Sequence, residues 1–275
     1  MNITAEQVSQ LEAKAKEIRK LTIDAIGYLG VGHIGGALSI VEVLTMLYYR
    51  HMHVDPEEPR MPGRDRLVIS KGHAGPALYS VLADKNFFPR EWLHTLNRGG
   101  THLPSHCDRN RTPGIDMTTG SLGQGISTAI GIAMANKMDS LGNHVYFIIG
   151  DGESNEGQIW EGAMSAAHYN LSNIIGFTDY NKMQIDGYTH EIMNLEDLGA
   201  KWQSFGWFVQ RVNGHDMYDL DMAVSRAGEE TLRPSMIILD TIKGKGAFFA
   251  ERNPANHNMK FDYETAQQAI KRLDE

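Results

Sequence analysis

The strongest chemical pattern in the sequence is an acidic glycine turn that is followed, further along the chain, by an asparagine. Gly150-Asp151-Gly152 comes directly after the apolar run Val145–Ile149. Asn181 follows a second apolar run, Ile174–Thr178. Between the runs lies a segment rich in Ala, Met and Gln, roughly Gln158–Leu171, whose composition and length predict a helix. The order of elements is therefore strand, helix, strand.

This order predicts that both polar side chains lie at one edge of a parallel sheet. Parallel neighbouring strands need a crossover of a dozen or more residues, which is almost always right-handed. Asp151 and Asn181 then follow the carboxyl ends of adjacent strands, where open α/β sheets bind ligands and a helix N-terminus favours phosphate. A carboxylate and an amide oxygen suit Mg²⁺ or Ca²⁺ rather than zinc.

In its details this stretch resembles the thiamine diphosphate motif of transketolases. The matching residues are Gly150-Asp151-Gly152, Glu156-Gly157, Glu161-Gly162 and Asp179-Tyr-Asn181-Lys-Met-Gln-Ile-Asp-Gly187. A lone Gly-Asp-Gly turn is common, and the second half of the pattern makes it specific. The resemblance implies that Asp151, the Asn181 side chain and the Met183 carbonyl hold a metal that bridges the cofactor diphosphate. It also implies cofactor contacts for Gly150 and Gly152, and a position for Glu156 at the subunit contact.

Histidines carry a second part of the resemblance, although any one of them could instead be a loop or core residue. His33 lies in a glycine-rich loop where transketolases carry Gly-His-Pro-Gly-Gly, and Ile34 replaces the proline. The resemblance implies that His33, His106 and His257 contact substrate hydroxyls and move protons, and that His73 lies near the diphosphate. His106 is the loosest of these matches.

Two glycine-containing loops complete the predicted site. Thr118–Gly125 closely matches a transketolase segment, with Ser121 in place of a proline, and exposed N–H groups of Ser121, Leu122 and Gly123 would suit the thiazolium and diphosphate. Lys243–Gly246 is a basic loop that could stay solvated or meet phosphate, and the resemblance places Lys243 beside the cofactor. We interpret Cys107 as an ordinary small side chain.

Composition indicates a globular enzyme of the cytoplasm. The chain has 275 residues, 26 basic and 34 acidic side chains and a net charge of −8, which argues against nucleic acid as the main partner. The sequence has no apolar run of membrane-spanning length, and its start is polar, unlike a signal peptide. The single cysteine fits a reducing compartment.

Strands and helices alternate along the sequence, which predicts one doubly wound α/β domain over residues 1–275, with a mainly parallel sheet and helices on both faces. Thr4 and Gln7 predict a capping box before a helix to about Leu29. Ser39 is predicted to cap a second helix, Glu191–Gly206 to form a helix, and Tyr263–Leu273 to form a charged, exposed one.

The resemblance covers nearly the whole chain but only the diphosphate-binding domain of a full transketolase. We expect the pyrimidine-binding and carboxyl-terminal domains, with the family's activating Glu and phosphate-anchoring arginines, to lie outside this polypeptide. We therefore expect a companion chain that carries them, in an assembly with two copies of each chain. The predicted reaction moves a two-carbon ketol unit from a ketose or its phosphate to an aldose or its phosphate, with thiamine diphosphate and Mg²⁺ or Ca²⁺.

Two alternatives remain open at this point. The chain could serve another thiamine diphosphate enzyme, such as a deoxyxylulose-phosphate synthase or a transketolase for an unusual sugar. It could also be a cofactor-free paralogue used for assembly or regulation. The presence of Asp151, Asn181 and Glu156 together counts against the second alternative.

Overall fold

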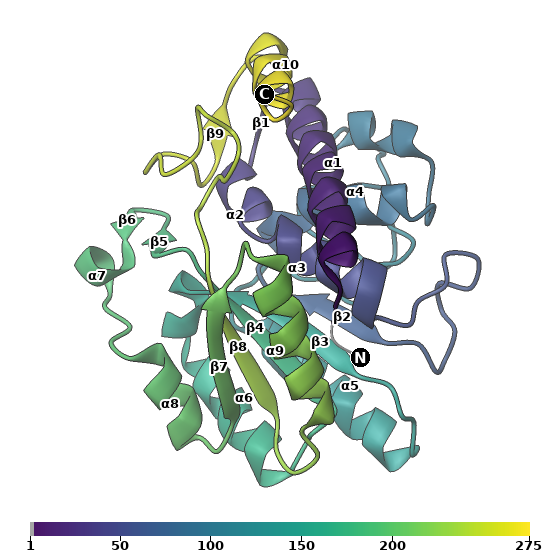
Figure 1. Ribbon diagram of the computed structural model, residues 1–275, viewed down its shortest axis with the longest axis vertical. Coiled ribbons are helices and arrows are strands. Elements are labelled where there is room, and N and C mark those ends of the chain that lie inside the picture. The colour runs from purple at the N-terminus through teal and green to yellow at the C-terminus, as the bar shows by residue number, and fades with distance from the viewer. Residues whose placement is uncertain (1–2) are drawn as a thin grey trace.

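A five-stranded sheet forms the centre of the molecule in the computed structural model, which describes residues 3–275 (Figure 1). In chain order, the strands of the central sheet and of two smaller ribbons are β1 (Val31–Gly32), β2 (Arg66–Ile69), β3 (Val145–Gly150), β4 (Ile174–Tyr180), β5 (Met183–Gln184), β6 (Gly187–Tyr188), β7 (Phe208–Asn213), β8 (Ser235–Asp240) and β9 (Met259–Lys260). The central order is β2-β3-β4-β8-β7, and every neighbouring pair is parallel. Antiparallel ribbons β1-β9 and β5-β6 lie outside it.

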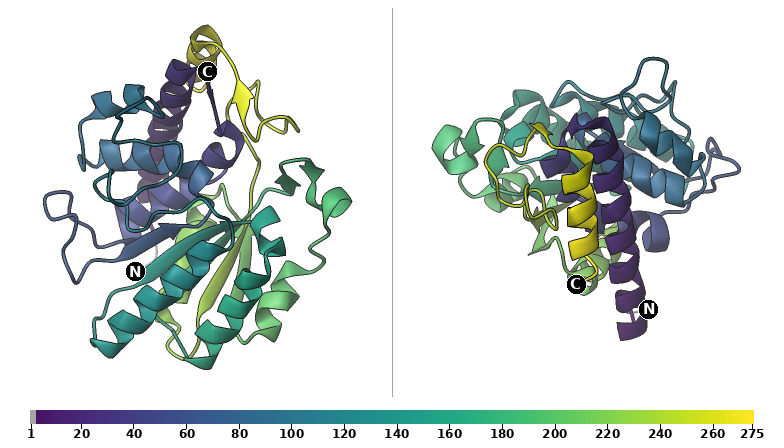
Figure 2. Two further views of the ribbon diagram at one scale, coloured as in Figure 1. Left: turned by 180° about the vertical axis from the view of Figure 1, so that it is seen from behind. Right: turned by 90° about the horizontal axis from the view of Figure 1, so that it is seen from above.

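Helices cover both faces of this sheet, as Figures 1 and 2 show. The helices are α1 (Ala5–Leu29), α2 (Ile34–Leu38), α3 (Val41–Met46), α4 (Gly75–Asp84), α5 (Gln124–Met138), α6 (Gly157–His168), α7 (Thr189–Ile192), α8 (Leu198–Ser204), α9 (Met217–Glu229) and α10 (Tyr263–Arg272). The predicted fold class is thus confirmed. Within residues 3–275, no helix combines the length and the apolar character that a bilayer crossing requires.

Strand side chains alternate between two apolar cores, because successive residues of a strand point to opposite faces. Phe147 and Ile149 pack with residues of α5, α6 and α8. Tyr146 and Ile148 pack with residues of α1, α3, α4 and α9. The sheet is buried on both faces, as parallel sheets generally are.

The first and last helices pack against each other along one side of the molecule (Figures 1 and 2). Thr4 and Gln7 form the predicted capping box of α1, and Gly30, with φ +86°, caps the other end of the helix. The final helix is less exposed than predicted, because its small residues Ala266 and Ala269 are buried. A Cβ on Gly27 of α1 would lie 2.3 Å from the Ala266 Cβ, so the close approach of the two helices requires glycine there.

Two other local predictions were wrong. Ser39 does not cap a helix: it follows α2, and its hydroxyl donates to Asp179 Oδ2 at 2.6 Å, a residue of β4. The segment Glu191–Gly206 is not one helix, since only the separate elements α7 and α8 are helical. At Ser39, a contact distant in sequence replaces the cap that local propensity favours.

Candidate functional site

Four parallel strands bring the predicted site residues to one edge of the sheet. Segments that follow β2, β3, β4 and β8 all lie at the carboxyl edge and surround a cavity of about 220 Å³. The cavity is lined by Gly36, Lys71, His73, Leu122, Gly150, Asp151, Gly152, Glu153, Glu156, Asn181, Met183, Gln184, Ile185, Lys243 and His257. Most of the residues that the sequence predicts are therefore neighbours in space.

Asp151 and Asn181 follow the adjacent strands β3 and β4, as predicted. Asp151 is buried, and its carboxylate accepts the N–H of Gly152 at 2.7 Å and that of Lys182 at 2.5 Å. Asn181 Nδ2 donates to Asp179 at 2.8 Å, and Asn181 Oδ1 accepts the Met183 N–H at 3.1 Å. These bonds fix both side chains at the floor of the cavity.

Asp179, which the sequence analysis did not select, organises the floor of the cavity from below. It is fully buried and accepts hydrogen bonds from Lys71 Nζ at 2.5 Å, from Asn181, and from the hydroxyls of Ser39 and Thr241. Burial alone would raise its pKa, but Lys71 and the hydroxyl donors hold the pKa below its usual value. Asp179 is therefore the charged partner that keeps Lys71 inside the protein.

The carboxylate of Asp151 has a different environment. Burial, and then the negative charge of Asp179, raise the pKa of Asp151 to about 7, although its two backbone N–H donors oppose the shift. A cation bound beside Asp151 would offset the free-energy cost of keeping its carboxylate charged. Asp151 is thus a carboxylate whose surroundings favour a positive ligand.

Glu153 supports the glycine turns rather than the ligand. Its carboxylate accepts the N–H groups of Gly123 at 2.8 Å and Gly150 at 3.0 Å, and also the hydroxyl of Ser70. The prediction of an exposed N–H at Gly123 is therefore wrong, because that group is bonded to Glu153 inside the protein. Ser121 lines an adjacent cavity of about 320 Å³ instead of the main one.

Two lysines give the cavity its positive charge. Lys71 and Lys243 are both buried and both line it. Burial lowers the pKa of Lys243 to about 8, while the charge of Asp151 opposes the shift. Lys243 Nζ lies 3.4 Å from the Met183 carbonyl and 3.5 Å from that of Gln184. The basic loop that could have been solvated is thus folded into the site.

The four predicted histidines form one cluster, although they come from four separate segments. The ring centroid of His33 lies 5.4 Å from that of His73, 5.4 Å from that of His106 and 5.3 Å from that of His257, and those of His73 and His257 are 5.0 Å apart. His73 and His257 line the main cavity, and His33 lines a small cavity beside it. The ribbon β1-β9 joins the segments that carry His33 and His257.

Burial favours the neutral form of all four imidazoles. Burial and then neighbouring positive groups lower the pKa of His33 and of His257 to about 4. Burial also lowers the pKa of His106, and it places the pKa of His73 well below its ordinary value. Neutral rings carry one donor and one acceptor each, so the cluster can hydrogen-bond hydroxyl groups of a polar ligand near neutral pH.

The residues present fit a diphosphate and a hard divalent cation. Asp151, Asn181 and the Met183 carbonyl offer oxygen atoms of the kind that Mg²⁺ and Ca²⁺ prefer, and Lys71 and Lys243 can face phosphate. Gln184 Nε2 is a buried donor without a hydrogen-bond partner among residues 3–275, and Gln184 lines the cavity. Within the same residues, no three His, Cys, Asp or Glu side chains form a metal site by themselves. A cation bound in this cavity would therefore also need oxygen atoms from a bound ligand in its coordination shell.

Lys71, Glu153, Asp179 and Gln184 were missed in the sequence. Asp179 had a usable signal, since it is a charge at the end of an otherwise apolar predicted strand. Lys71 lies in Ser-Lys-Gly-His directly after a strand, at the same edge as Asp151. Asp179 and Lys71 are buried because they pair with each other across the sheet, and no local sequence pattern shows this pairing. Cys107, in contrast, behaves as interpreted: it is buried, and burial raises its pKa to about 12.

A parallel α/β sheet with converging polar side chains and two buried lysines at its carboxyl edge is typical of a domain that binds a phosphorylated ligand. Residues 11–273 match the family described as transketolase, thiamine diphosphate binding domain. The chain therefore belongs to the transketolase family. This membership confirms the prediction, made from the sequence, that the chain is a transketolase subunit.

Similar proteins cover the chain from end to end. It is 59% identical over 270 residues to the 6-deoxy-6-sulfo-D-fructose transketolase subunit SqwG of Clostridium sp., covering 98% of both chains. It is 39% identical over 269 residues to one subunit of the apulose-4-phosphate transketolase of Phocaeicola vulgatus, covering 98% of this chain and 95% of that one. The crystal structure of transketolase from Campylobacter jejuni matches with a TM-score of 0.91 at 30% identity, covering 100% of this chain and 43% of that chain.

Proposed function

We propose that the chain is the thiamine-diphosphate-binding subunit of a two-chain transketolase. The convergence of Asp151, Asn181, Lys71 and Lys243 in one cavity carries this proposal. Relatives of the same length named as transketolase subunits support it. A companion chain supplies the pyrimidine-binding and carboxyl-terminal parts, in an assembly with two copies of each chain. Glu156, exposed at the rim of the cavity, lies where that companion closes the site.

Asp151, the Asn181 side chain and the Met183 carbonyl hold Mg²⁺ or Ca²⁺ in this proposal. Lys71, Lys243 and His73 face the diphosphate. The bound thiamine diphosphate supplies an electron sink for breaking the bond next to a ketose carbonyl. The protein residues orient the cofactor, and Lys71 keeps its place through the buried pair with Asp179.

The histidines bind the sugar chain. His33, His106 and His257 are neutral at pH 7, because burial lowers the pKa of each, so each can donate to one hydroxyl and accept from another. A neutral imidazole can also take a proton from a substrate hydroxyl as the ketol unit is released. Their low pKa values favour hydrogen bonding and proton acceptance over donation by a resident imidazolium.

We propose a ketose with an anionic sulfonate at C6 as the donor substrate, rather than a pentose phosphate. The support is the 59% identity to a protein named for 6-deoxy-6-sulfo-D-fructose, against 39% to one named for apulose 4-phosphate. The acceptor is an aldose or its phosphate. This narrows the prediction made from the sequence, in which an unusual sugar was one of the alternatives.

Donor competition tests this substrate assignment. The chain is purified with its companion, and 6-deoxy-6-sulfo-D-fructose, fructose 6-phosphate and xylulose 5-phosphate are compared as donors to glyceraldehyde 3-phosphate. The sulfonated ketose should give the highest kcat/KM. A higher kcat/KM for xylulose 5-phosphate would agree with the transketolase assignment but contradict the sulfonated ketose as the preferred donor. Absence of transfer from every donor, with thiamine diphosphate bound, would overturn both.

A further inference from the structure

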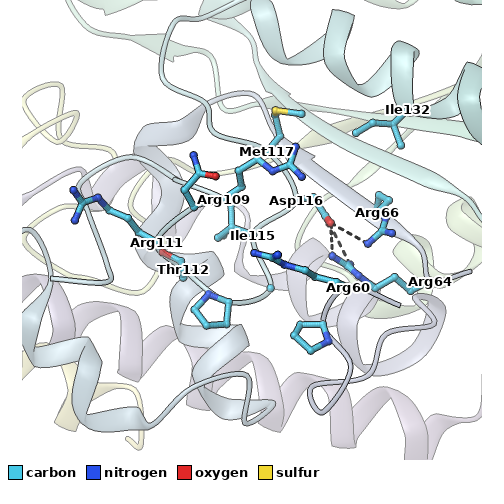
Figure 3. A pocket seen from close by; sticks show the side chains of 14 residues that line it. Arg60, Arg64, Arg66, Arg109, Arg111, Thr112, Ile115, Asp116, Met117 and Ile132 are labelled. Carbon is cyan, nitrogen blue, oxygen red and sulfur yellow. Dashed lines mark hydrogen bonds and ion pairs between the residues drawn. The ribbon is translucent and has the colours of Figure 1, made fainter. Parts of the chain in front are cut away.

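Another cavity in the part of the chain that the structure describes is lined by arginines. It has a volume of about 680 Å³ and lies between the loop before β2 and the loop 109–117, with Ile132 of α5 at one side (Figure 3). Its arginines are Arg60, Arg64, Arg66, Arg109 and Arg111. The two cavities share no lining residue.

A buried ion pair forms the base of this arginine cavity. Arg64 is 3% exposed and pairs with Asp116, whose side chain is 4% exposed. Arg66 Nη1 lies 3.5 Å from the same carboxylate. Figure 3 shows dashed lines from Asp116 to these two arginines only. Arg64 Nε is buried and has no hydrogen-bond partner in the part of the chain that the structure describes. The base therefore holds more positive charge and more donors than Asp116 can satisfy.

Three more arginines surround this base. Arg60 and Arg109 are exposed, and within residues 3–275 neither guanidinium has an ion-pair or hydrogen-bond partner. Arg111 lies 3.6 Å from Asp108, the second carboxylate paired with these arginines. Burial, then the charge of Arg64, lower the pKa of Arg66, and Arg109 adds to the repulsion. Five arginines against two carboxylates leave an excess of three positive charges.

The chemistry of the lining narrows the ligand. Guanidinium groups bind phosphate oxygens with two parallel N–H bonds, so several of them together favour an anion with more than one charge. Ile115, Met117 and Ile132 add an apolar wall. The volume falls in the range of small-molecule sites and exceeds what inorganic phosphate would fill. An organic molecule with a charged phosphate end matches both parts of the lining.

We propose that this arginine cavity is a second ligand site, which binds an organic phosphate carrying at least two negative charges. Arg60 and Arg109 supply the direct contacts. Arg64 and Arg66 are held in place by Asp116 and add charge from below. The site does not depend on the proposed transketolase activity, because none of its lining residues lines the cavity that holds Asp151 and Asn181.

Calorimetric titration of the full chain tests the proposal, with EDTA present and thiamine diphosphate absent. The probes are inorganic pyrophosphate and fructose 1,6-bisphosphate. The test variant is Arg60→Ser/Arg109→Ser, which removes two exposed and unpaired side chains without touching the buried pair. The matched control is Arg226→Ser/Lys271→Ser, which removes two exposed charges from α9 and α10. Lys243→Gln reports binding in the other cavity.

The test variant should bind fructose 1,6-bisphosphate about 10-fold or more weakly, since it loses two charge-assisted contacts to the anion. The control and Lys243→Gln should retain a site of wild-type affinity. Unchanged binding in the test variant, or loss of all binding in Lys243→Gln, would overturn the proposal. Binding of pyrophosphate alone would exclude an organic ligand. Weaker association of the test variant with the companion chain, at unchanged anion affinity, would instead make the cavity a protein contact.

Discussion

Replacing Asp179 with asparagine removes the charge that holds the floor of the cofactor cavity while keeping the size of the side chain. Asp179 accepts from Lys71, Asn181, Ser39 and Thr241 at the end of β4. In the variant, one carboxylate oxygen becomes an NH₂ group that faces these donors. Lys71, which is 2% exposed, is left as a buried cation without its counterion.

The expected loss of stability follows from that unpaired charge. Removing one partner of a buried ion pair typically costs about 3–5 kcal/mol of unfolding free energy, because the remaining charge is not solvated. Unfolding entropy of about 2.1 cal/mol/K per residue gives about 0.6 kcal/mol/K for a chain of this size. Asp179→Asn should therefore lower Tm by about 5–9 °C.

Urea unfolding of the wild type, Asp179→Asn, Lys71→Met and the double variant measures this effect. Each single variant leaves one buried charge, so each should lose about 3–5 kcal/mol. The double variant leaves none and should lose clearly less than the sum of the two. Strict additivity, or a loss below about 1 kcal/mol for Asp179→Asn, would refute the pairing as the source of stability.

Three further outcomes are expected. Asp151→Asn should weaken Mg²⁺-dependent binding of thiamine diphosphate by at least about tenfold in a calorimetric titration, because it replaces an anionic oxygen ligand; equal affinity would remove Asp151 from the ligand set. The low pKa values of His33 and His257, about 4, lie below the value of about 6.5 in the unfolded chain. As the pH decreases, the unfolded state therefore binds protons before the folded state does. The free energy of unfolding should decrease between about pH 6.5 and 4, and this decrease should be smaller in His33→Gln/His257→Gln. Gly123→Ala should lower the free energy of unfolding in urea by about 1–3 kcal/mol, since Gly123 has φ +85° and an added Cβ would lie 2.8 Å from the Glu156 Cβ. The control is Gly131→Ala on the exposed side of α5, where an added Cβ would have no neighbouring atom within 4 Å. This control should be neutral or stabilising.

The parts of the site that could be predicted depend on local pattern and one rule of topology. The apolar runs before Asp151 and Asn181, with a helix between them, already require adjacent parallel strands. Their register, with Gly150 opposite Asp179, then follows from the fold. The resemblance of the glycine turns and histidine loops to transketolases supplied the remaining positions.

The parts that could not be predicted depend on contacts between distant segments. Ser39 has the type and spacing of a helix cap, but a buried carboxylate from β4 takes its hydroxyl. Ala266 and Ala269 of α10 are buried by the close approach of this helix to α1, a contact between the two ends of the chain. The arginine cavity joins two loops far apart in sequence, and neither loop shows an obvious basic run.

The most direct test of the central claim is reconstitution of ketol transfer. The tagged chain is purified from its source, its stoichiometric companion is identified, and each is then produced alone. Transfer from 6-deoxy-6-sulfo-D-fructose to glyceraldehyde 3-phosphate is measured with thiamine diphosphate and Mg²⁺ for each chain and for the mixture. Activity in the mixture alone, lost with Asp151→Asn, is the predicted result. Activity of this chain without a companion, or a mixture that binds no thiamine diphosphate, would contradict the account.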